Sequence, residues 1–362
     1  MNRDRYPQLE ADLGKLKENL AALRERCKDS FVGIIGVVKG VNAWPEVVRV
    51  YDEMEFPYLA SSRLDQLKKM RAQGVRTPLM LIRVPMLSEL SDMIALADAS
   101  LQSDLSVLRA AEQEAARQGR RHGVLLMTDL GDLREGFWNP EELADAAAEV
   151  ETKLTHLHLL GVGVNLSCYG SIRPDENNMR RLAELAAEVE QAVGRPIEFV
   201  SGGASTSTYL VLDGTMPRRV NNLRLGEIGL VGRANYGCDP DFTHRDVFTL
   251  RAEVVECRDK PSFPVGQLTV DAFGHAGHYE DRGVRRRALI AVGKVDYGDP
   301  ADLKPRTAGV EILGASSDHT ILDVEAVKDR IHVGDILEFD VNYASLVNLT
   351  NTPGVELIVR GR

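Results

Sequence analysis

The sequence predicts a TIM-type (β/α)8 barrel followed by a mostly β domain. Eight short apolar runs alternate with longer amphipathic segments over about 235 residues, close to the ~250 residues of such barrels. After about residue 245 the pattern changes to apolar runs separated by Gly, Pro and Asp turns. The turn-rich segment 236–241 is the expected junction, which gives residues 1–240 to the barrel and 241–362 to the β domain. A doubly wound open sheet is the alternative for the first part.

The elements follow from periodicity. Leucines recur at helical spacing from Leu9 to Leu23, so a helix is expected over residues 8–26. The β-branched run 31–38 is typical of a strand buried on both faces. The other expected parallel strands are 57–60, 78–82, 99–102, 124–128, 157–164, 197–200 and 222–225. Helical patterns lie between them at 45–54, 62–72, 88–97, 104–118, 140–152 and 176–193. The β domain has runs at 247–256, 267–272, 287–292, 310–314, 319–323, 335–341 and 355–359.

Charge and composition favour small-molecule chemistry. The 44 Lys and Arg against 54 Asp and Glu leave a net charge of −10, which gives no general attraction to nucleic acid or anionic lipid. The longest apolar run is far shorter than the ~20 residues that cross a bilayer, and the first residues are polar, so a cytoplasmic protein is expected. No disulfide framework or zinc ribbon is expected from the four widely spaced cysteines Cys27, Cys168, Cys238 and Cys257.

Polar residues follow the expected strands at their carboxyl ends, where barrel active sites lie. Many donors and cations would therefore meet at one mouth. These residues are Lys39, Ser61, Arg63, Arg83, Ser103, Asp129, Arg134, Asn165, Ser201, Ser205 and Arg224.

Lys39 is the strongest candidate for a catalytic residue among them. A lysine at the end of a hydrophobic strand would lie in a low-dielectric setting that lowers its pKa and favours the neutral amine. A neutral amine of this kind can form a Schiff base with a carbonyl compound. The alternative is a strand-end lysine that simply reaches water.

The segment 201–208 (SGGASTST) offers backbone N–H groups and hydroxyls to an anion, and phosphate suits such a loop. The turn at 225–227 lies after the next strand, and the loops after strands seven and eight are the usual phosphate site of barrels. A capping segment without a ligand is the alternative. Arg224 would direct a cation toward the same mouth, or form a structural salt bridge.

No metal site is expected, because the pairs His156/His158 and His275/His278 lack further ligands at a suitable spacing.

Several motifs in the same order resemble the alanine-racemase-like pyridoxal-phosphate enzymes, and within them the ornithine racemase and predicted amino-acid racemase branch. The resemblance runs nearly end to end. Its most specific segments are 36–39 (GVVK), 83–89, 129–136 (DLGDLREG), 165–170, 201–203 (SGG), 222–227 (NLRLGE), 271–274 and 314–319. It implies a fold type III enzyme, with a pyridoxal 5'-phosphate-binding barrel before a β domain, paired head to tail as a homodimer.

The resemblance also implies roles for single residues. Lys39 would hold the cofactor covalently, while Arg224 would face its pyridine nitrogen and Arg134 its phenolic oxygen. An arginine keeps that nitrogen unprotonated, which weakens the ring as an electron sink and suits racemisation. The remaining expected cofactor contacts are Asn165, Ser201, Gly202, Gly203, Ser205, Gly226, Glu227 and Tyr343.

The chain departs from alanine racemases at three places. Met127 stands where they have a carbamylated lysine, and residues 41–44 replace their Gly-His-Gly loop. Phe273 stands where they have a catalytic tyrosine, and phenylalanine has no proton to exchange.

Because racemisation needs proton transfer on both faces of Cα, a second group must act besides Lys39. Asp318 or His319 is the leading candidate, with Cys168 and Tyr169 behind them.

The expected activity is therefore that of an isomerase, a racemase of ornithine or another basic amino acid, with alanine as a further candidate. A distal substrate cation could pair with acidic residues near the mouth, namely Asp132, Glu135, Asp271 and Asp318. One alternative is aldol cleavage or dehydration of a β-hydroxy amino acid on the same scaffold, with a metal in the β domain. The other is a non-catalytic cofactor carrier, although such carriers lack the second domain.

Overall fold

The computed structural model describes residues 4–234, 239–270, 273–274 and 276–360. The chain divides into two compact units. One is formed by residues 16–244, and the other by the described parts of residues 1–15 and 245–362. The expected junction 236–241 falls partly outside the described residues, since positions 235–238 are among those left out.

The first unit is a closed barrel of eight parallel strands, as predicted. β9 pairs with β2, which closes the ring and excludes the open-sheet alternative. The strands are β2 (Gly33–Val37), β3 (Leu59–Ser61), β4 (Leu79–Leu81), β5 (Ala99–Gln102), β6 (His122–Thr128), β7 (Leu157–Val164), β8 (Phe199–Ser201) and β9 (Asn222–Leu225).

An apolar core fills the barrel. Buried side chains from most strands meet inside it, among them Ile35, Met80, Leu101, Leu125 and Met127. Met127 is thus a core residue, which agrees with its apolar character.

Gly36 shows how tightly β2 is packed. A Cβ atom there would come within 2.8 Å of Phe56 and 2.9 Å of Tyr51. The glycine therefore lets β2 lie close to its neighbours three residues before Lys39.

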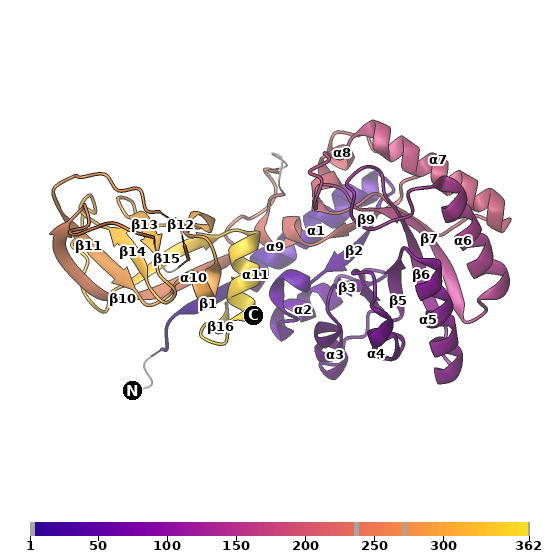
Figure 1. The fold of residues 1–362 in the computed structure, drawn as a ribbon, viewed down its shortest axis with the longest axis horizontal. Helices are drawn as coiled ribbons and strands as arrows, with labels where there is room; N and C mark the ends of the chain where they lie inside the picture. The colour runs from indigo at the N-terminus through magenta and orange to yellow at the C-terminus, as the bar shows by residue number, and fades with distance from the viewer. Residues whose placement is uncertain (1–3, 235–238, 271–272, 275, 361–362) are drawn as a thin grey trace. The chain divides into compact units, whose positions relative to one another are not determined.

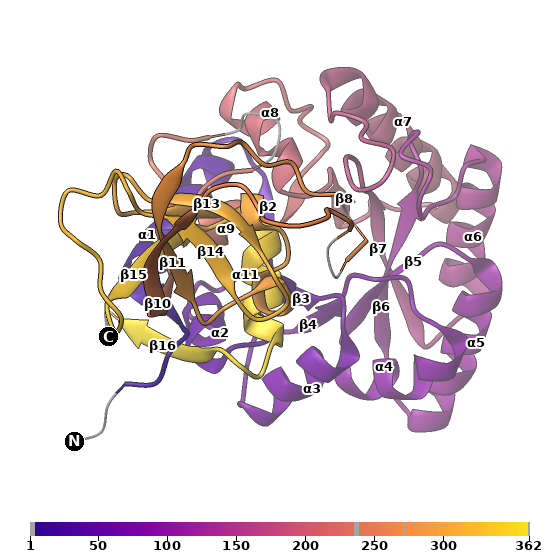
Figure 2. The same ribbon diagram turned by 60° about the vertical axis from the view of Figure 1, so that its left-hand side comes forward.

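Helices surround the barrel strands (Figure 1 and, from a second side, Figure 2). Most of the predicted helices are present with ends shifted by one or two residues, and α7 begins and ends as predicted. The helices are α2 (Pro45–Asp52), α3 (Leu64–Ala72), α4 (Leu90–Leu96), α5 (Leu105–Gln118), α6 (Pro140–Lys153), α7 (Glu176–Val193), α8 (Thr208–Leu212) and α9 (Glu227–Val231).

The second unit is mostly β, as predicted. Its strands run in the order β12-β15-β10-β11-β14-β13, with β1 and β16 at the side of β10. They are β1 (Gln8–Asp12), β10 (Phe248–Pro261), β11 (Val284–Ile290), β12 (Leu303–Pro305), β13 (Glu311–Ala315), β14 (Thr320–Asp323), β15 (Ile336–Val341) and β16 (Glu356–Arg360).

Two short helices of this unit escaped the periodicity analysis, α10 (Lys294–Tyr297) and α11 (Tyr343–Asn351). α11 is a nine-residue helix, too short for its spacing to stand out, and Asn342 caps it by accepting from the Ser345 N–H at 3.0 Å. The run 267–272 was expected as a strand. Its described part forms only an isolated bridge between Val270 and Ala276.

The helix predicted over residues 8–26 is wrong at its start. Residues 8–12 form β1, and α1 covers Leu13–Asp29. β1 pairs antiparallel with β10 and parallel with β16, so the N-terminal segment belongs to the second unit and not, as expected, to the barrel. Leu9 fits both a helical and a strand period, and the available sheet edge decides between them.

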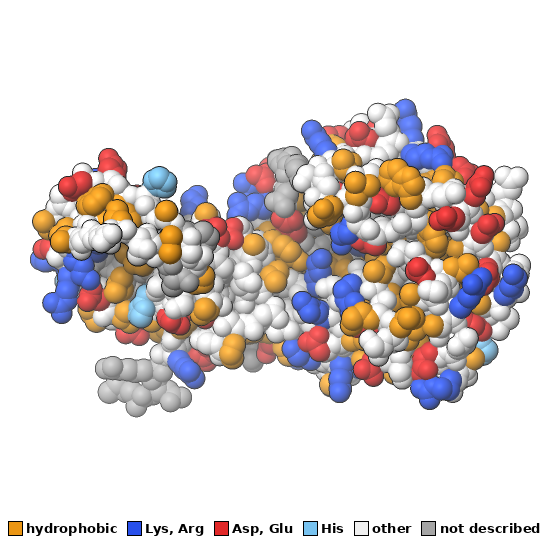
Figure 3. Space-filling view, in the orientation of Figure 1, with side chains coloured by type: hydrophobic (Ala, Val, Ile, Leu, Met, Phe, Trp, Pro, Cys, Tyr) orange, Lys and Arg blue, Asp and Glu red, His pale blue; other side chains and the backbone are white. Residues whose placement is uncertain are grey.

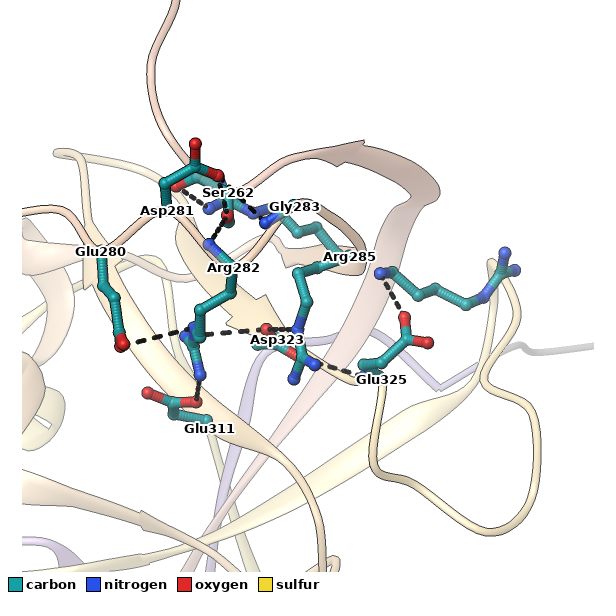
Figure 4. A network of polar contacts seen from close by, with 11 residues as sticks. Ser262, Glu280, Asp281, Arg282, Gly283, Arg285, Glu311, Asp323 and Glu325 are labelled. Carbon is teal, nitrogen blue, oxygen red and sulfur yellow. Dashed lines mark hydrogen bonds and ion pairs between the residues drawn. The ribbon is translucent and has the colours of Figure 1, made fainter.

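An arginine-rich network joins three strands and a loop of the second unit. Asp323, whose side chain is 3% exposed, accepts from Arg285 Nε at 2.8 Å and lies 3.7 Å from Arg282. Arg282 also pairs with Glu311 at 2.9 Å (Figure 4). The buried carboxylate thus offsets the charges of neighbouring arginines, which gives this cluster a structural explanation.

The surface carries mixed charge. Side chains of both signs are interspersed on the face shown in Figure 3. Among the residues that the structure describes, no helix is both long and apolar enough to cross a membrane.

We predict that Leu9→Ala loosens the second unit selectively. Leu9 is fully buried in β1, and truncating such a leucine typically costs about 2–5 kcal/mol. Hydrogen exchange read by mass spectrometry should be faster in peptides from β10 and β16 and unchanged in β5 to β7. Val333→Ala, at a residue of the same unit that is 62% exposed, serves as the control. Equal acceleration in both units would contradict the assignment of β1.

Candidate active site at the barrel mouth

Lys39 lies two residues after the end of β2 and begins the short turn Lys39–Val41. Its backbone is held from the neighbouring strand, because Gln66 Nε2 donates to the Lys39 carbonyl at 3.5 Å and Ser61 Oγ donates to Gln66 Oε1 at 2.6 Å. Asn42 then has a φ of 48°, in the left-handed region. These contacts fix the point from which the lysine side chain enters the mouth.

The surroundings of Lys39 favour its neutral form. The residue is exposed at the mouth, but the barrel walls displace enough water from its amine that burial lowers its pKa. The nearby Cys168 and Glu135 oppose this shift, while the cations Arg134 and Arg224 add to it. The direction of this shift is the one that the sequence analysis expects for Lys39.

Arg224 lies at the centre of the mouth and is only 3% exposed. Its guanidinium donates to Ser201 Oγ at 2.6 Å, to the Val164 carbonyl at 2.8 Å and to Asn165 Oδ1 at 2.5 Å. Burial lowers its pKa to about 10, so the group remains a cation at neutral pH. No carboxylate of the described residues pairs with Arg224 directly. The structural salt bridge that the sequence analysis considered for Arg224 is therefore not formed by these residues.

Ser201 was expected on a phosphate, but its hydroxyl supports Arg224. Besides accepting from the arginine, it donates to Asn222 Oδ1 at 2.7 Å. Asn222 in turn donates to the Gly33 carbonyl at 3.3 Å. The guanidinium is thus anchored across β8, β9 and β2.

A second chain of contacts runs from Arg224 across the mouth. Asn165, which follows β7, accepts from Arg224 and donates to Glu135 Oε1. The other oxygen of Glu135 lies 2.8 Å from Arg134 Nε. Arg134, Glu135, Asn165 and Arg224 therefore form one connected group.

The glycine-rich loop after β8 has unsatisfied donors. The hydroxyls of Thr206, Ser207 and Thr208 are buried and have no hydrogen-bond partner among the residues that the structure describes. Gly203 has a φ of 104°, and a Cβ there would come within 2.9 Å of Ser207 Oγ. Buried hydroxyls without partners are costly, so this loop fits an anionic ligand such as a phosphate.

Ser205 joins this loop to the turn after β9. Its Oγ accepts from the N–H groups of Gly226 at 3.4 Å and of Ile228 at 3.2 Å. Glu227 lies between them, and burial raises its pKa to about 7, against the opposing effects of Arg233 and Lys39. The predicted residues of the two turns are therefore brought together, with Ser205 as the link.

Asp132 was expected to face a substrate cation, and the structure gives it another task. Its carboxylate is buried and accepts from the backbone N–H groups of Ser167, Cys168, Tyr169 and Ile172 at 2.9–3.3 Å. These bonds lower its pKa against the effect of burial. Asp132 therefore holds the loop that presents Cys168 to the mouth. Sequence spacing gave no sign of this long-range pairing.

Three predicted site residues belong to the second unit. Asp318 and His319 lie in the exposed turn between β13 and β14, where Ser317 Oγ donates to Asp318 Oδ2 at 2.6 Å. Tyr343 begins α11 and is half-buried. Asp271, also named as a partner for a substrate cation, lies outside the described residues.

The histidine pairs considered for a metal have other partners. His156 Nδ1 lies 2.8 Å from Glu112, and His158 Nε2 lies 2.6 Å from Glu198. In the described part of the chain, no three side chains of the metal-binding types come together. His275 falls outside that part.

The donors at the mouth fit pyridoxal 5'-phosphate. Lys39 supplies an amine for a carbonyl carbon, the hydroxyls at 206–208 suit its phosphate, and Arg224 offers a buried cation to a ring nitrogen. These three features lie at the carboxyl ends of strands in one barrel.

Known proteins resemble this chain over most of its length. The model of the family "Alanine racemase, N-terminal domain" matches residues 11–233. The chain is 40% identical to the ornithine racemase of Acetoanaerobium sticklandii, over 94% of this chain and 96% of that one. It is 33% identical to the lysine racemase of Thermotoga maritima, over 98% of each chain.

A solved structure of alanine racemase from Clostridium difficile 630 covers 99% of this chain and 97% of its own length, with a TM-score of 0.76 and 16% identity. This likeness confirms the fold, a barrel followed by a β domain. With a family model that matches most of the barrel unit and two relatives that match nearly end to end, the chain belongs to the alanine racemase N-terminal domain family.

Proposed function

We propose that this protein is a pyridoxal-phosphate-dependent amino-acid racemase, an isomerase that acts on ornithine or another basic amino acid. The observation that carries the proposal is the buried Arg224 beside Lys39 at the mouth of the barrel, next to a loop with unsatisfied hydroxyls. The similarity to proteins named ornithine racemase and lysine racemase, over nearly the whole chain, supports the substrate class.

Each residue of the mouth has a task in this proposal. Pyridoxal phosphate, when bound, withdraws electrons from the substrate Cα and makes its proton acidic. Lys39 holds the cofactor and then accepts the Cα proton at Nζ, and the burial that lowers its pKa favours the neutral amine that this step needs. Arg224 keeps its proton because its pKa stays near 10. The turns at 201–208 and 226–227 hold the phosphate, joined by Ser205.

A second group must deliver a proton to the opposite face of Cα. We assign this to Asp318 or His319, in the turn after β13, ahead of Cys168 and Tyr169. Both leading candidates are exposed, and the Asp318 carboxylate accepts a hydrogen bond from Ser317 Oγ at 2.6 Å. Asp132 is committed to backbone N–H groups and Glu135 to Arg134 and Asn165, so Asp318 is also the better partner for a distal substrate ammonium.

We also propose a cytoplasmic location. The described cysteines Cys27, Cys168 and Cys257 are free thiols, as expected in a reducing compartment.

Incubation of the cofactor-loaded protein with single L-amino acids in deuterated water tests the activity. We expect loss of optical purity together with deuterium at Cα, fastest with ornithine or lysine. Lys39→Ala should lower the rate at least about 100-fold, because it removes both the cofactor anchor and a proton acceptor. Chiral chromatography and mass spectrometry read the two signals.

Borohydride treatment followed by peptide mapping is the companion measurement. The pyridoxyl group should be found on Lys39 and not on Lys69, an exposed lysine near it in the fold that donates to Asn42. Labelling elsewhere, or cleavage of β-hydroxy amino acids without racemisation, would refute the proposed function.

Asp318→Asn and His319→Ala separate the candidates for the second proton transfer. We expect the variant at the acting residue to lose racemisation by about 100-fold or more while it still binds the cofactor with wild-type affinity. Val284→Ala, at a residue of the same unit that is 69% exposed, is the control. If both variants keep near wild-type exchange at Cα, neither residue is the second acid or base.

We propose a head-to-tail homodimer, supported by large apolar side chains exposed on loops at the mouth: Leu133 at 64%, Trp138 at 67% and Tyr169 at 73%. Such a surface suits burial by a second copy. Light scattering should give twice the 39.9 kDa chain mass, and Leu133→Glu should shift the protein toward monomer. Phe31→Glu, at an exposed residue before β2 and away from the mouth, should not. A monomeric wild type would refute this assembly.

A further inference from the structure

Glu135 is the one carboxylate that connects the two arginines of the mouth in the described barrel. Its Oε2 pairs with Arg134 Nε at 2.8 Å. Its Oε1 accepts from the amide nitrogen of Asn165, whose oxygen accepts from Arg224 at 2.5 Å. The Glu135 side chain is only 12% exposed, so it is built into the site and not spread on the surface.

The burial of Arg224 makes this connection important. The partners that touch its guanidinium, Ser201 Oγ, the Val164 carbonyl and Asn165 Oδ1, are all neutral. A buried charge is costly unless an opposite charge compensates it. Glu135 is the leading influence that favours the charged form of Arg224 against burial.

The contacts also fix the orientation of the Asn165 amide. An ionised carboxylate can only accept hydrogen bonds, so Asn165 must direct its NH2 group toward Glu135 and its oxygen toward Arg224. A neutral glutamine at position 135 could accept or donate. The Asn165 amide would then be held in its orientation by Arg224 alone, which can only donate, and the negative charge that compensates the buried guanidinium would be lost.

We infer that Glu135 is a positioning residue of the cofactor site, which fixes Arg224 through Asn165 and holds Arg134 directly. The inference rests on the proposed function, because it takes Arg224 and Arg134 as the groups that meet the cofactor. It goes beyond that function by giving Glu135 a task other than binding the substrate. The carboxylate orders the two cations before any ligand arrives.

Titration of the apoprotein with pyridoxal 5'-phosphate, followed by absorbance, tests the inference. Glu135→Gln keeps the size of the side chain and removes its charge, and we expect binding at least about tenfold weaker, the effect of one charged hydrogen bond. Glu149→Gln is the matched control. Glu149 pairs with Arg109 on the outer helices and is 13% exposed, so its loss should leave the affinity unchanged.

The pH dependence of Lys39 acylation in the apoprotein gives a second readout without any cofactor. Glu135 favours the ammonium form of Lys39, so its neutralisation should move the reaction midpoint to lower pH. A merely structural contact would not move this midpoint. Glu149→Gln should again match the wild type.

Asn165→Ala breaks the link to Arg224 and leaves the Glu135–Arg134 pair intact. It should weaken cofactor binding in the same way, and the double variant should lose less than the product of the two single losses, because both cut the same chain. If circular dichroism shows that Glu135→Gln does not fold, the Asn165→Ala variant tests the inference in its place.

Two outcomes would overturn the inference: Glu135→Gln binding pyridoxal phosphate within about twofold of the wild type, or independent effects in the double variant. Either leaves the proposed function standing if borohydride labels Lys39 in the wild type. Absence of that label in the wild type would instead remove the proposed function itself.

Discussion

The buried guanidinium of Arg224 is the constraint around which the barrel mouth is organised. A permanent cation that is 3% exposed has to be surrounded by acceptors, and the carboxyl ends of two strands, β7 and β8, supply them. Ser201, Asn165 and the Val164 carbonyl fill this role, so their positions follow from the charge they enclose. The same charge lowers the pKa of Lys39, and it thereby links the arginine to the amine that reacts.

Side-chain hydrogen bonds join the loops of the mouth to one another. Asp132 satisfies several backbone donors of the loop after β7, and Ser205 joins the turns after β8 and β9. These bonds order the backbone before a ligand binds, which reduces the entropy lost on binding. Polar residues that seemed available for substrate in the sequence are thus part of the scaffold.

The sequence predicted the barrel well because buried parallel strands leave continuous apolar runs and because their carboxyl ends mark the site. It therefore located Lys39 and Arg224. It did not predict which partner a flexible polar side chain takes, as Asp132 and Glu135 illustrate, since their contacts join loops far apart in the sequence. It also missed β1, because five residues whose apolar positions suit two periods are assigned only by the sheet edge they meet.

The carboxylates of the mouth are already hydrogen-bonded to the protein, and this affects how a racemase of this kind can distinguish its substrates. Reading a distal ammonium requires an acceptor that is not already saturated. Within the described barrel, Asp132 accepts from four backbone N–H groups, Glu135 already pairs with Arg134 and Asn165, and Asp129 accepts from the N–H groups of Gly131 and Leu133. Under the proposed assignment of Asp318 to the substrate ammonium, cofactor binding and side-chain recognition are carried by different residues. Substitutions at Asp318 are then expected to change substrate preference without disturbing Arg224, because Asp318 is not among the groups that accept from its guanidinium.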